Sequence, residues 1–342
     1  NSALADRTDG HAAMKALVYT APRRLEYRDE PDPVPGAGEA LVRVDAVGIC
    51  GSDMHAWHGH DPRRVPPLIL GHEAAGEVVG GAGAGRRVTM NPLIACGRCD
   101  YCQTGRGNLC PNRTMIGMTR PGAYARYVAI PESCLVDLPA GMKPEHAALA
   151  EPAATSWHAV ALGGRALARG LAEADALVIG GGAVGLLAAL ILRARGVPGL
   201  RVAETNPLRR ATAARAGLDV IDPGEAGIAG SSADLVLDAV GGARTRAAAL
   251  SAVRPGGVVV HVGLMDSDGP LDVRRITLAE IAFLGCYTYS TPDLRAAVDA
   301  LHRGALGDLS WIETRPLANG GEAFTDLDAG RTAAAKIILL PG

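Results

Sequence analysis

The sequence has no long apolar run and no excess of charge of either sign. No apolar stretch approaches the roughly 20 residues that a helix needs to cross a bilayer, so no transmembrane segment is expected. Lys and Arg total 34 against 36 Asp and Glu, and no basic run breaks this balance. The composition therefore gives no sign of a surface for nucleic acid or for an anionic membrane.

The first 13 residues, NSALADRTDGHAA, also lack the apolar core of a secretory signal peptide. We interpret residues 1–13 as a leader or tag remnant and expect the fold to begin at Met14. A chain that is not exported is expected in the cytoplasm, a reducing compartment where clustered cysteines bind metal more often than they form disulfides. The length of 342 residues is enough for two domains, each with its own core.

Four of the seven cysteines fall within one short segment, CGRCDYCQTGRGNLC, with the spacing C-x2-C-x2-C-x7-C. Disulfide pairing and chance are the alternatives to a metal site. The odd number of cysteines and the two consecutive C-x2-C steps favour a single zinc ion. Four thiolates leave no open coordination position, so this zinc is expected to hold a loop rather than take part in chemistry. The predicted ligands are Cys96, Cys99, Cys102 and Cys110.

A glycine-rich segment, GGGAVG, follows a β-type apolar run at 176–179 and precedes an apolar helical pattern. In this context Gly180 permits a tight turn, Gly182 lets the backbone approach a pyrophosphate, and Gly185 lets the helix pack on the strand. Glu204 stands at the end of the next expected strand, where a carboxylate accepts hydrogen bonds from ribose hydroxyls and repels a 2′-phosphate. The pattern predicts a site for NAD rather than NADP; a glycine-rich turn without a ligand is the alternative.

The two halves of the chain differ in their patterns. Strand-like runs at 233–241 and 256–264, separated by a helical segment, continue the βα alternation of a doubly wound parallel sheet. Before the glycines, short alternating runs such as 39–48 and 72–80 are broken by Gly and Pro, which indicates a mostly β, barrel-like or sandwich-like domain. The expected fold class is therefore α/β, with a β domain preceding a nucleotide-binding domain.

Three short segments in the β half carry further potential ligands, GICGSDMH, LGHEAAG and ALAEPAA. Taken singly, Cys50 could be an inert thiol, His72 a core histidine and Glu151 a carboxylate at a helix start. In this order, and with the cysteine loop and the glycine motif, the sequence from Met14 to Gly342 resembles the zinc-dependent medium-chain alcohol dehydrogenase family, especially its polyol (sorbitol) and threonine dehydrogenase branch.

The resemblance implies a GroES-like catalytic β domain over 14–152, completed by 289–342, and a Rossmann NAD-binding domain over 153–288. The active site would lie in the cleft between the two domains. The resemblance also implies a homodimer or a homotetramer.

A catalytic zinc with one open coordination position is implied as well. Its ligands would be Cys50, His72 and one carboxylate, either Glu73 or Glu151, with a slight preference for Glu151 in the substrate-free state. Such a zinc lowers the pKa of a bound alcohol, and the hydride then passes from the carbinol carbon to the nicotinamide.

Ser52 and His55 match the spacing of the family's proton relay. Ser52 would accept the hydroxyl proton of the substrate and pass it through the ribose hydroxyls to His55. His58 and His60 lie in the same segment and could take the role of His55 or simply cover the surface.

Further cofactor contacts are implied by position. Thr155 and Val184 correspond to residues that pack on the nicotinamide, and Arg209 to the side chain that caps the adenine and its ribose. The strand end that would border the nicotinamide carboxamide comprises Val262, Gly263 and Leu264.

The substrate class is indicated by two further positions. Trp57 matches the sorbitol dehydrogenase pattern C-G-S-D-x-H-x-W, whereas Thr288-Tyr289 stands where that branch carries Arg-Tyr. Trp57 and Tyr289 are the expected substrate contacts, and the predicted reaction converts a secondary alcohol, polyol or cyclitol to a ketone with NAD. The alternatives are a threonine-type or other secondary-alcohol dehydrogenase, a zinc-free quinone or enoyl reductase of the same superfamily, and a catalytically silent protein that binds zinc and NAD.

Overall fold

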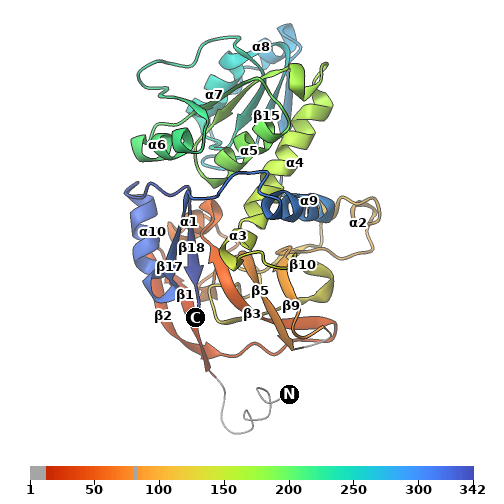
Figure 1. Ribbon diagram of the computed structural model, residues 1–342, viewed down its shortest axis with the longest axis vertical. Helices are drawn as coiled ribbons and strands as arrows, with labels where there is room; N and C mark the ends of the chain where they lie inside the picture. The colour runs from red at the N-terminus through yellow and green to blue at the C-terminus, as the bar shows by residue number, and fades with distance from the viewer. Residues whose placement is uncertain (1–12, 81–82) are drawn as a thin grey trace.

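The computed structural model describes residues 13–80 and 83–342, and it divides into two lobes (Figure 1). Most of the expected leader, residues 1–12, lies outside the described residues, while Ala13 already begins strand β1 (Ala13–Ala21). None of the described helices combines the length and the apolar character that a membrane span requires.

The lower lobe in Figure 1 is built mainly from antiparallel strands. Its strands from the first half of the chain are β1, β2 (Arg24–Pro31), β3 (Glu39–Gly48), β4 (Leu68–Ile69), β5 (Glu73–Gly80), β6 (Arg87–Met90), β7 (Leu93–Ile94), β8 (Thr114–Met115), β9 (Tyr127–Pro131) and β10 (Leu135–Asp137). Its short helices in that half are α1 (Gly51–Trp57), α2 (Asp100–Gln103) and α3 (Pro144–Ala147). The last elements of the chain are β17 (Ile312–Pro316), α10 (Gly320–Asp328) and β18 (Lys336–Leu340).

Strand β3 is the centre of this lobe. The main sheet has the order β10-β6-β5-β3-β18-β17, and β9 also pairs with β3, so the end of the chain returns to the sheet formed by its beginning. Alternation along β3 explains its position: Val42 and Val44 are buried in the core, whereas Arg43 points outward and pairs with Glu77 of β5 at 2.8 Å.

The upper lobe contains a parallel sheet of the order β13-β12-β11-β14-β15-β16. Its strands are β11 (Asp175–Ile179), β12 (Gly199–Ala203), β13 (Asp219–Ile221), β14 (Ala233–Asp238), β15 (Val253–His261) and β16 (Ala282–Gly285). The helices around it are α4 (Ala150–Ala166), α5 (Ala183–Ala194), α6 (Pro207–Arg215), α7 (Ala243–Ala252), α8 (Val273–Leu278) and α9 (Thr291–His302). The strand order reverses between β11 and β14, and such a switch point is where this kind of sheet binds nucleotides.

Helix α4 joins the two sheets through one continuous apolar core. The cluster that contains its buried alanines also includes Ala75 and Ile338 from the antiparallel sheet, and Leu186 and Val260 from the parallel lobe. Alanine-rich packing lets α4 lie close to both sheets. The space between the lobes is therefore bordered on one side by this shared core.

Candidate active site

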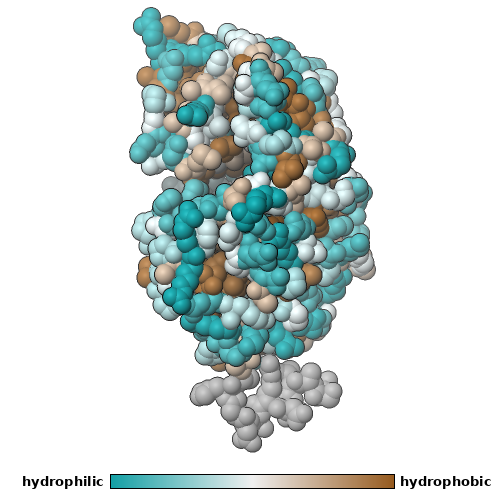
Figure 2. All heavy atoms as spheres, turned by 90° about the vertical axis from the view of Figure 1, so that its left-hand side faces the viewer, coloured by the Kyte–Doolittle hydropathy of each residue, from teal (hydrophilic) through white to brown (hydrophobic). Residues whose placement is uncertain are grey.

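A cavity of about 530 Å³ lies between the lobes, where Figure 2 shows the surface hollowed. Residues just beyond the carboxyl ends of β11, β12, β14, β15 and β16 line it from the parallel sheet. The opposite wall comes from α1, the start of β5 and the segment that joins them. The cavity therefore opens at the switch point of the parallel sheet, as expected for a nucleotide site.

Three potential metal ligands meet in this cavity. Cys50 immediately precedes α1, His72 precedes β5, and Glu73 begins β5 in register with the end of β3. One ligand atom from each of the three lies within 4.8 Å of the others. A thiol, an imidazole and a carboxylate that converge in this way suit a zinc ion with a fourth position left open.

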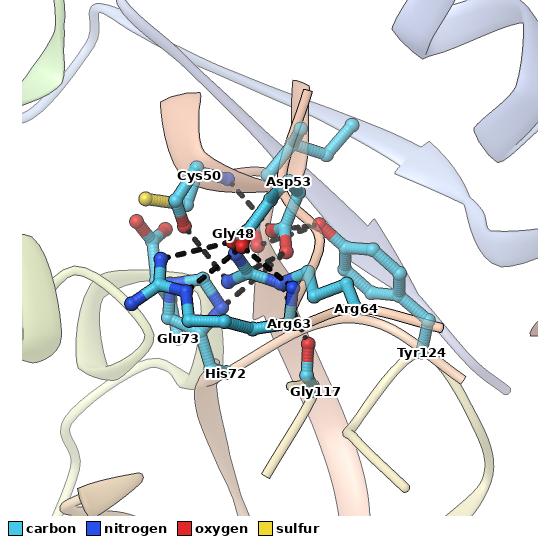
Figure 3. Close-up of polar contacts among 12 residues, drawn as sticks. Gly48, Cys50, Asp53, Arg63, Arg64, His72, Glu73, Gly117 and Tyr124 are labelled. Atoms are coloured by element: carbon cyan, nitrogen blue, oxygen red, sulfur yellow. Dashed lines mark hydrogen bonds and ion pairs between the residues drawn. The ribbon is translucent and has the colours of Figure 1, made fainter. Parts of the chain in front are cut away.

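A buried carboxylate holds the imidazole of His72 in place (Figure 3). Asp53 Oδ1 lies 3.4 Å from His72 Nδ1, which leaves Nε2 available to a metal. Asp53 also accepts hydrogen bonds from the Cys50 backbone N–H at 3.1 Å and from the Tyr124 hydroxyl at 2.7 Å. Burial alone would raise the pKa of Asp53, but His72, Arg64 and Tyr124 together lower it well below its usual range. Asp53 therefore stays ionised beside the proposed ligands.

The two carboxylates that the sequence leaves open have different surroundings. Lys336 Nζ donates to both oxygens of Glu73, at 2.7 and 2.6 Å, and to the Ile49 carbonyl at 2.8 Å. Burial raises the pKa of Glu151 to about 7, and the charge of Glu73 adds to this effect. Only Glu73 belongs to the set of ligand atoms within 4.8 Å, so the geometry favours it over Glu151, for which we expected a slight preference.

The residues of the expected proton relay both line the cavity. The Ser52 hydroxyl accepts a hydrogen bond from Arg64 Nη2 at 3.1 Å. Among the three neighbouring histidines only His55 lines the cavity, because His58 binds Asp328 at 2.7 Å and stacks on His60. Burial and then the charges of His60 and His58 lower the pKa of His55.

The four clustered cysteines form a second potential metal site, in the loop around α2. Cys99 Sγ lies 3.4 Å from Cys102 Sγ, which lies 3.9 Å from Cys96 Sγ, and Cys110 Sγ accepts the Cys96 N–H. Sulfurs held 2.3 Å from one zinc stand about 3.8 Å apart in a tetrahedron, so these spacings fit. The described cysteines are all free, which rules out the disulfide alternative in this structure.

The cysteine loop also contacts the wall of the cavity. Asn108 Nδ2 donates to the Tyr287 carbonyl at 2.9 Å, and the Arg113 guanidinium lies 4.8 Å from the centre of the Tyr287 ring. Tyr287 lines the cavity next to Thr288. A change in the loop can therefore reach the substrate side of the site.

The glycine turn has the geometry that a pyrophosphate needs. Gly180 has a φ of +102°, which favours glycine, and a side chain at Gly185 would collide with the Gly180 carbonyl. A Cβ at Gly182 would meet no atom within 4 Å, so the backbone there faces open space. Helix α5 begins one residue later, and its N-terminal N–H groups suit an anion.

Most of the expected cofactor contacts lie around this cavity. Its lining includes Thr155, Gly180, Gly182, Val184, Glu204, Arg209, Val262, Gly263 and Leu264. Gly185 does not line it, because it packs beneath the turn. Glu204 accepts hydrogen bonds from the backbone N–H groups of Gly181 and Asn206, both at 2.7 Å.

The two expected substrate contacts lie elsewhere. Trp57 is 5% exposed, packs against Phe324 with ring centres 6.1 Å apart, and does not line the cavity, so the structure corrects its predicted role. Tyr289 is buried, and Glu151 is a neighbour of its hydroxyl. The geometry between the two groups does not meet that of a hydrogen bond. Thr288 and Tyr287 line the cavity instead of Tyr289.

Comparisons with known proteins identify the family. Residues 36–140 match the model of the alcohol dehydrogenase GroES-like domain, and residues 183–303 match that of the zinc-binding dehydrogenases. The L-galactonate-5-dehydrogenase of Escherichia coli (strain K12) is 37% identical over 330 residues, which cover 92% of this chain and 95% of that protein. The chain belongs to the zinc-binding dehydrogenase family. The predicted family and the predicted α/β fold class, a GroES-like domain with a Rossmann domain, are thereby confirmed.

Other relatives of this dehydrogenase differ in substrate and cofactor. The L-threonine 3-dehydrogenase of Saccharopolyspora erythraea is 30% identical and covers 95% of this chain and 98% of its own. The acetophenone reductase of Geotrichum candidum NBRC 4597, solved with NAD, has a TM-score of 0.86 at 28% identity, with 97% and 98% of the chains covered. A zinc-binding dehydrogenase of Sinorhizobium meliloti 1021, solved with NADP, has a TM-score of 0.84 at 30% identity, with 96% and 100% covered.

Several residues of the site of this dehydrogenase were not predicted from the sequence. Asp53 directly follows Ser52, and an acidic residue so close to a proposed ligand could have suggested an orienting role. Tyr124 and Lys336 give no comparable local signal, because their partners Asp53 and Glu73 lie 71 and 263 residues away in the chain.

Proposed function

We propose that this dehydrogenase oxidises the secondary alcohol of a small polar molecule, a polyol or a cyclitol, to the ketone and transfers the hydride to NAD. The observation that carries the proposal is the convergence of Cys50, His72 and Glu73 in the cavity that the glycine turn also lines. A metal site with an open position and a nucleotide site in one cavity are what a hydride transfer from an alcohol requires.

The residues of the chain have distinct parts in this reaction. Cys50, His72 and Glu73 would hold the catalytic zinc, which supplies Lewis acidity to the alcohol oxygen when bound. Asp53 keeps His72 oriented toward the ion and Ser52 accepts the hydroxyl proton of the substrate.

His55, which lies at the cavity wall, passes this proton on toward solvent. On the cofactor side, Thr155 and Val184 pack on the nicotinamide, and the glycine turn with the start of α5 holds the pyrophosphate. The closed site of four cysteines would hold a structural zinc that maintains the loop around α2.

Related proteins support a polar substrate. Those named L-galactonate-5-dehydrogenase, L-threonine 3-dehydrogenase and sorbitol dehydrogenase each act on a molecule with several polar groups, and all are 29% identical or more to this chain. The cavity offers Ser52, Tyr287 and Thr288 as hydroxyl partners for such a molecule.

We also infer the domain division predicted above, with 14–152 and 289–342 in the catalytic domain and 153–288 in the Rossmann domain. The strands of the two sheets support it, since those of the parallel sheet all fall within 175–285. A homodimer or homotetramer is our inference from the family, and the cytoplasm is our inference from the sequence.

The proposed function is tested by NADH formation in the zinc-loaded protein with a panel of polyols, cyclitols, L-threonine and simple secondary alcohols. We expect oxidation of at least one polar secondary alcohol with a kcat/KM of about 10⁴ M⁻¹s⁻¹ or more, within the usual range of enzymes. NAD binding without oxidation of any alcohol would instead indicate a silent binding protein. Reduction of a quinone or an enoyl compound by the zinc-free protein would indicate the reductase alternative.

A further inference from the structure

Two consecutive arginines, Arg63 and Arg64, line the cavity on the side of the proposed zinc ligands (Figure 3). Arg64 is 2% exposed, and its guanidinium donates hydrogen bonds to other groups of the protein. It donates to the Gly117 carbonyl at 2.9 Å, to Asp61 at 2.5 Å and to the Ser52 hydroxyl at 3.1 Å. Arg64 therefore fixes the wall of the cavity and positions Ser52.

Arg63 has a different environment. More than half of its side chain is exposed, 55%, although it lines the same cavity. Its Nε and Nη2 donate to the two oxygens of Asp61 at 2.8 and 2.9 Å, so one edge of the guanidinium is held in place. No described residue accepts a hydrogen bond from its Nη1, and this edge is free to bind a ligand. A guanidinium with one edge fixed is already oriented for a second carboxylate.

The local charge also favours an anion. Asp61 is a single carboxylate that binds both Arg63 and Arg64. Burial alone would raise the pKa of Asp61, but the hydrogen bonds and charge of Arg63, with the charge of Arg64, lower it to about 2. Asp61 thus divides its charge between two guanidinium groups, whereas Arg64 also lies 4.0 Å from the buried carboxylate of Asp53 and its guanidinium is fully occupied by protein groups. The deeper Glu73 is already paired with Lys336.

Arg63 shares the cavity with Thr288, a residue that departs from the sorbitol dehydrogenase pattern. By the resemblance described above, Thr288 stands where the sorbitol dehydrogenase branch carries an arginine. Arg63, Tyr287 and Thr288 all line this one cavity. A guanidinium from the segment after α1 is therefore present in the cavity although position 288 carries a threonine.

We propose that Arg63 binds a carboxylate of the substrate and makes this dehydrogenase selective for polyhydroxy acids over neutral polyols. The substrate carboxylate accepts hydrogen bonds from Nη1 and from the second N–H of Nη2, while its secondary hydroxyl lies at Cys50, His72 and Glu73. This inference rests on the proposed function, because it names the substrate class of the same cavity.

The test compares a hexonate with the hexitol of the same configuration as substrates of the zinc-loaded enzyme. In the wild type we expect the higher kcat/KM for the hexonate. Arg63→Gln should lower the ratio of kcat/KM for hexonate over hexitol by about 10- to 100-fold, since a charge-assisted hydrogen bond is lost. Most of the change should appear in KM, and Arg63→Lys should recover part of the ratio because it restores the charge.

Arg303→Gln is a matched control, because Arg303 also pairs with a carboxylate, Asp299, at 2.5 Å, but its exposed side chain directly follows α9 and lies outside the cavity. It should leave the ratio within two-fold, an approximate limit set by its distance from the site. A wild type that oxidises the hexitol but not the hexonate, or a ratio that Arg63→Gln does not change, would overturn the inference and leave the proposed function intact. Failure to oxidise any alcohol would refute the proposed function and, with it, this inference.

Discussion

Replacement of Cys50 by serine is expected to abolish alcohol oxidation while the chain stays folded. Residue 50 is the N-cap of α1, a position that serine favours, so the fold should persist. A neutral hydroxyl, however, is a poor replacement for a thiolate ligand of zinc. Loss of several kcal/mol of Lewis-acid stabilisation corresponds to a fall of at least about 1,000-fold in kcat/KM. The measurement is NADH formation together with thermal unfolding.

Cys99→Ser provides the matched comparison at the other metal site. Because a closed zinc site contributes folding free energy, this variant should lose zinc and unfold at a lower temperature than Cys50→Ser. Its remaining activity should show a raised KM, since the loop supports Tyr287 through Asn108. An equal loss of folding in both variants would contradict the division into a catalytic and a structural zinc.

Glu204→Ala should remove a strong preference for NAD over NADP. In the wild type the carboxylate lines the cavity at the end of β12, where we propose that the ribose lies, and we expect a discrimination of about 30- to 1,000-fold in kcat/KM. Arg210 does not offset this charge, because it is bound to Asp222 at 2.7 Å and to the Glu204 and Thr205 carbonyls. The buried Nε of Arg209 has no partner among the described residues, and this arginine would meet the phosphate in the variant.

The measurement is the ratio of kcat/KM with NAD and NADP before and after the substitution. The family alone does not determine this ratio, since one of its members has been solved with NADP and another protein of the same fold with NAD. Glu204→Gln separates charge from hydrogen bonding, because it keeps an acceptor for the Gly181 N–H. A wild type that prefers NADP, or a preference unchanged in both variants, would show that Glu204 does not face the ribose.

The parts of the site that could be predicted from the sequence are those that depend on short spacings. The cysteine loop and the glycine turn each lie within a few turns of chain, so their residue types and spacing alone indicate their geometry. Cys50 and His72 could be predicted only from the order of several motifs, because β3 and β5 must pair before the two side chains meet.

Other features depend on packing that no local pattern reports. Trp57 lies on a short helix whose buried face is determined by Phe324, far along the chain, so a matching motif did not place it in the cavity. The choice of Glu73 over Glu151 depends on the pairing of β3 with β5, which brings the Glu73 carboxylate within 4.8 Å of the Cys50 and His72 ligand atoms. The burial of Arg64 depends on Gly117, whose carbonyl it reaches across 53 residues of chain, so no local pattern indicates it.

The proposed function requires a zinc ion at Cys50, His72 and Glu73 for alcohol oxidation with NAD. It is tested most directly by returning zinc to metal-free protein while zinc content and NADH formation are both measured. The closed four-cysteine site should fill first, so activity should rise only as the content passes from about one to about two ions per chain. Full activity in zinc-free protein, or a protein with both sites filled that oxidises no alcohol, would contradict the proposed function.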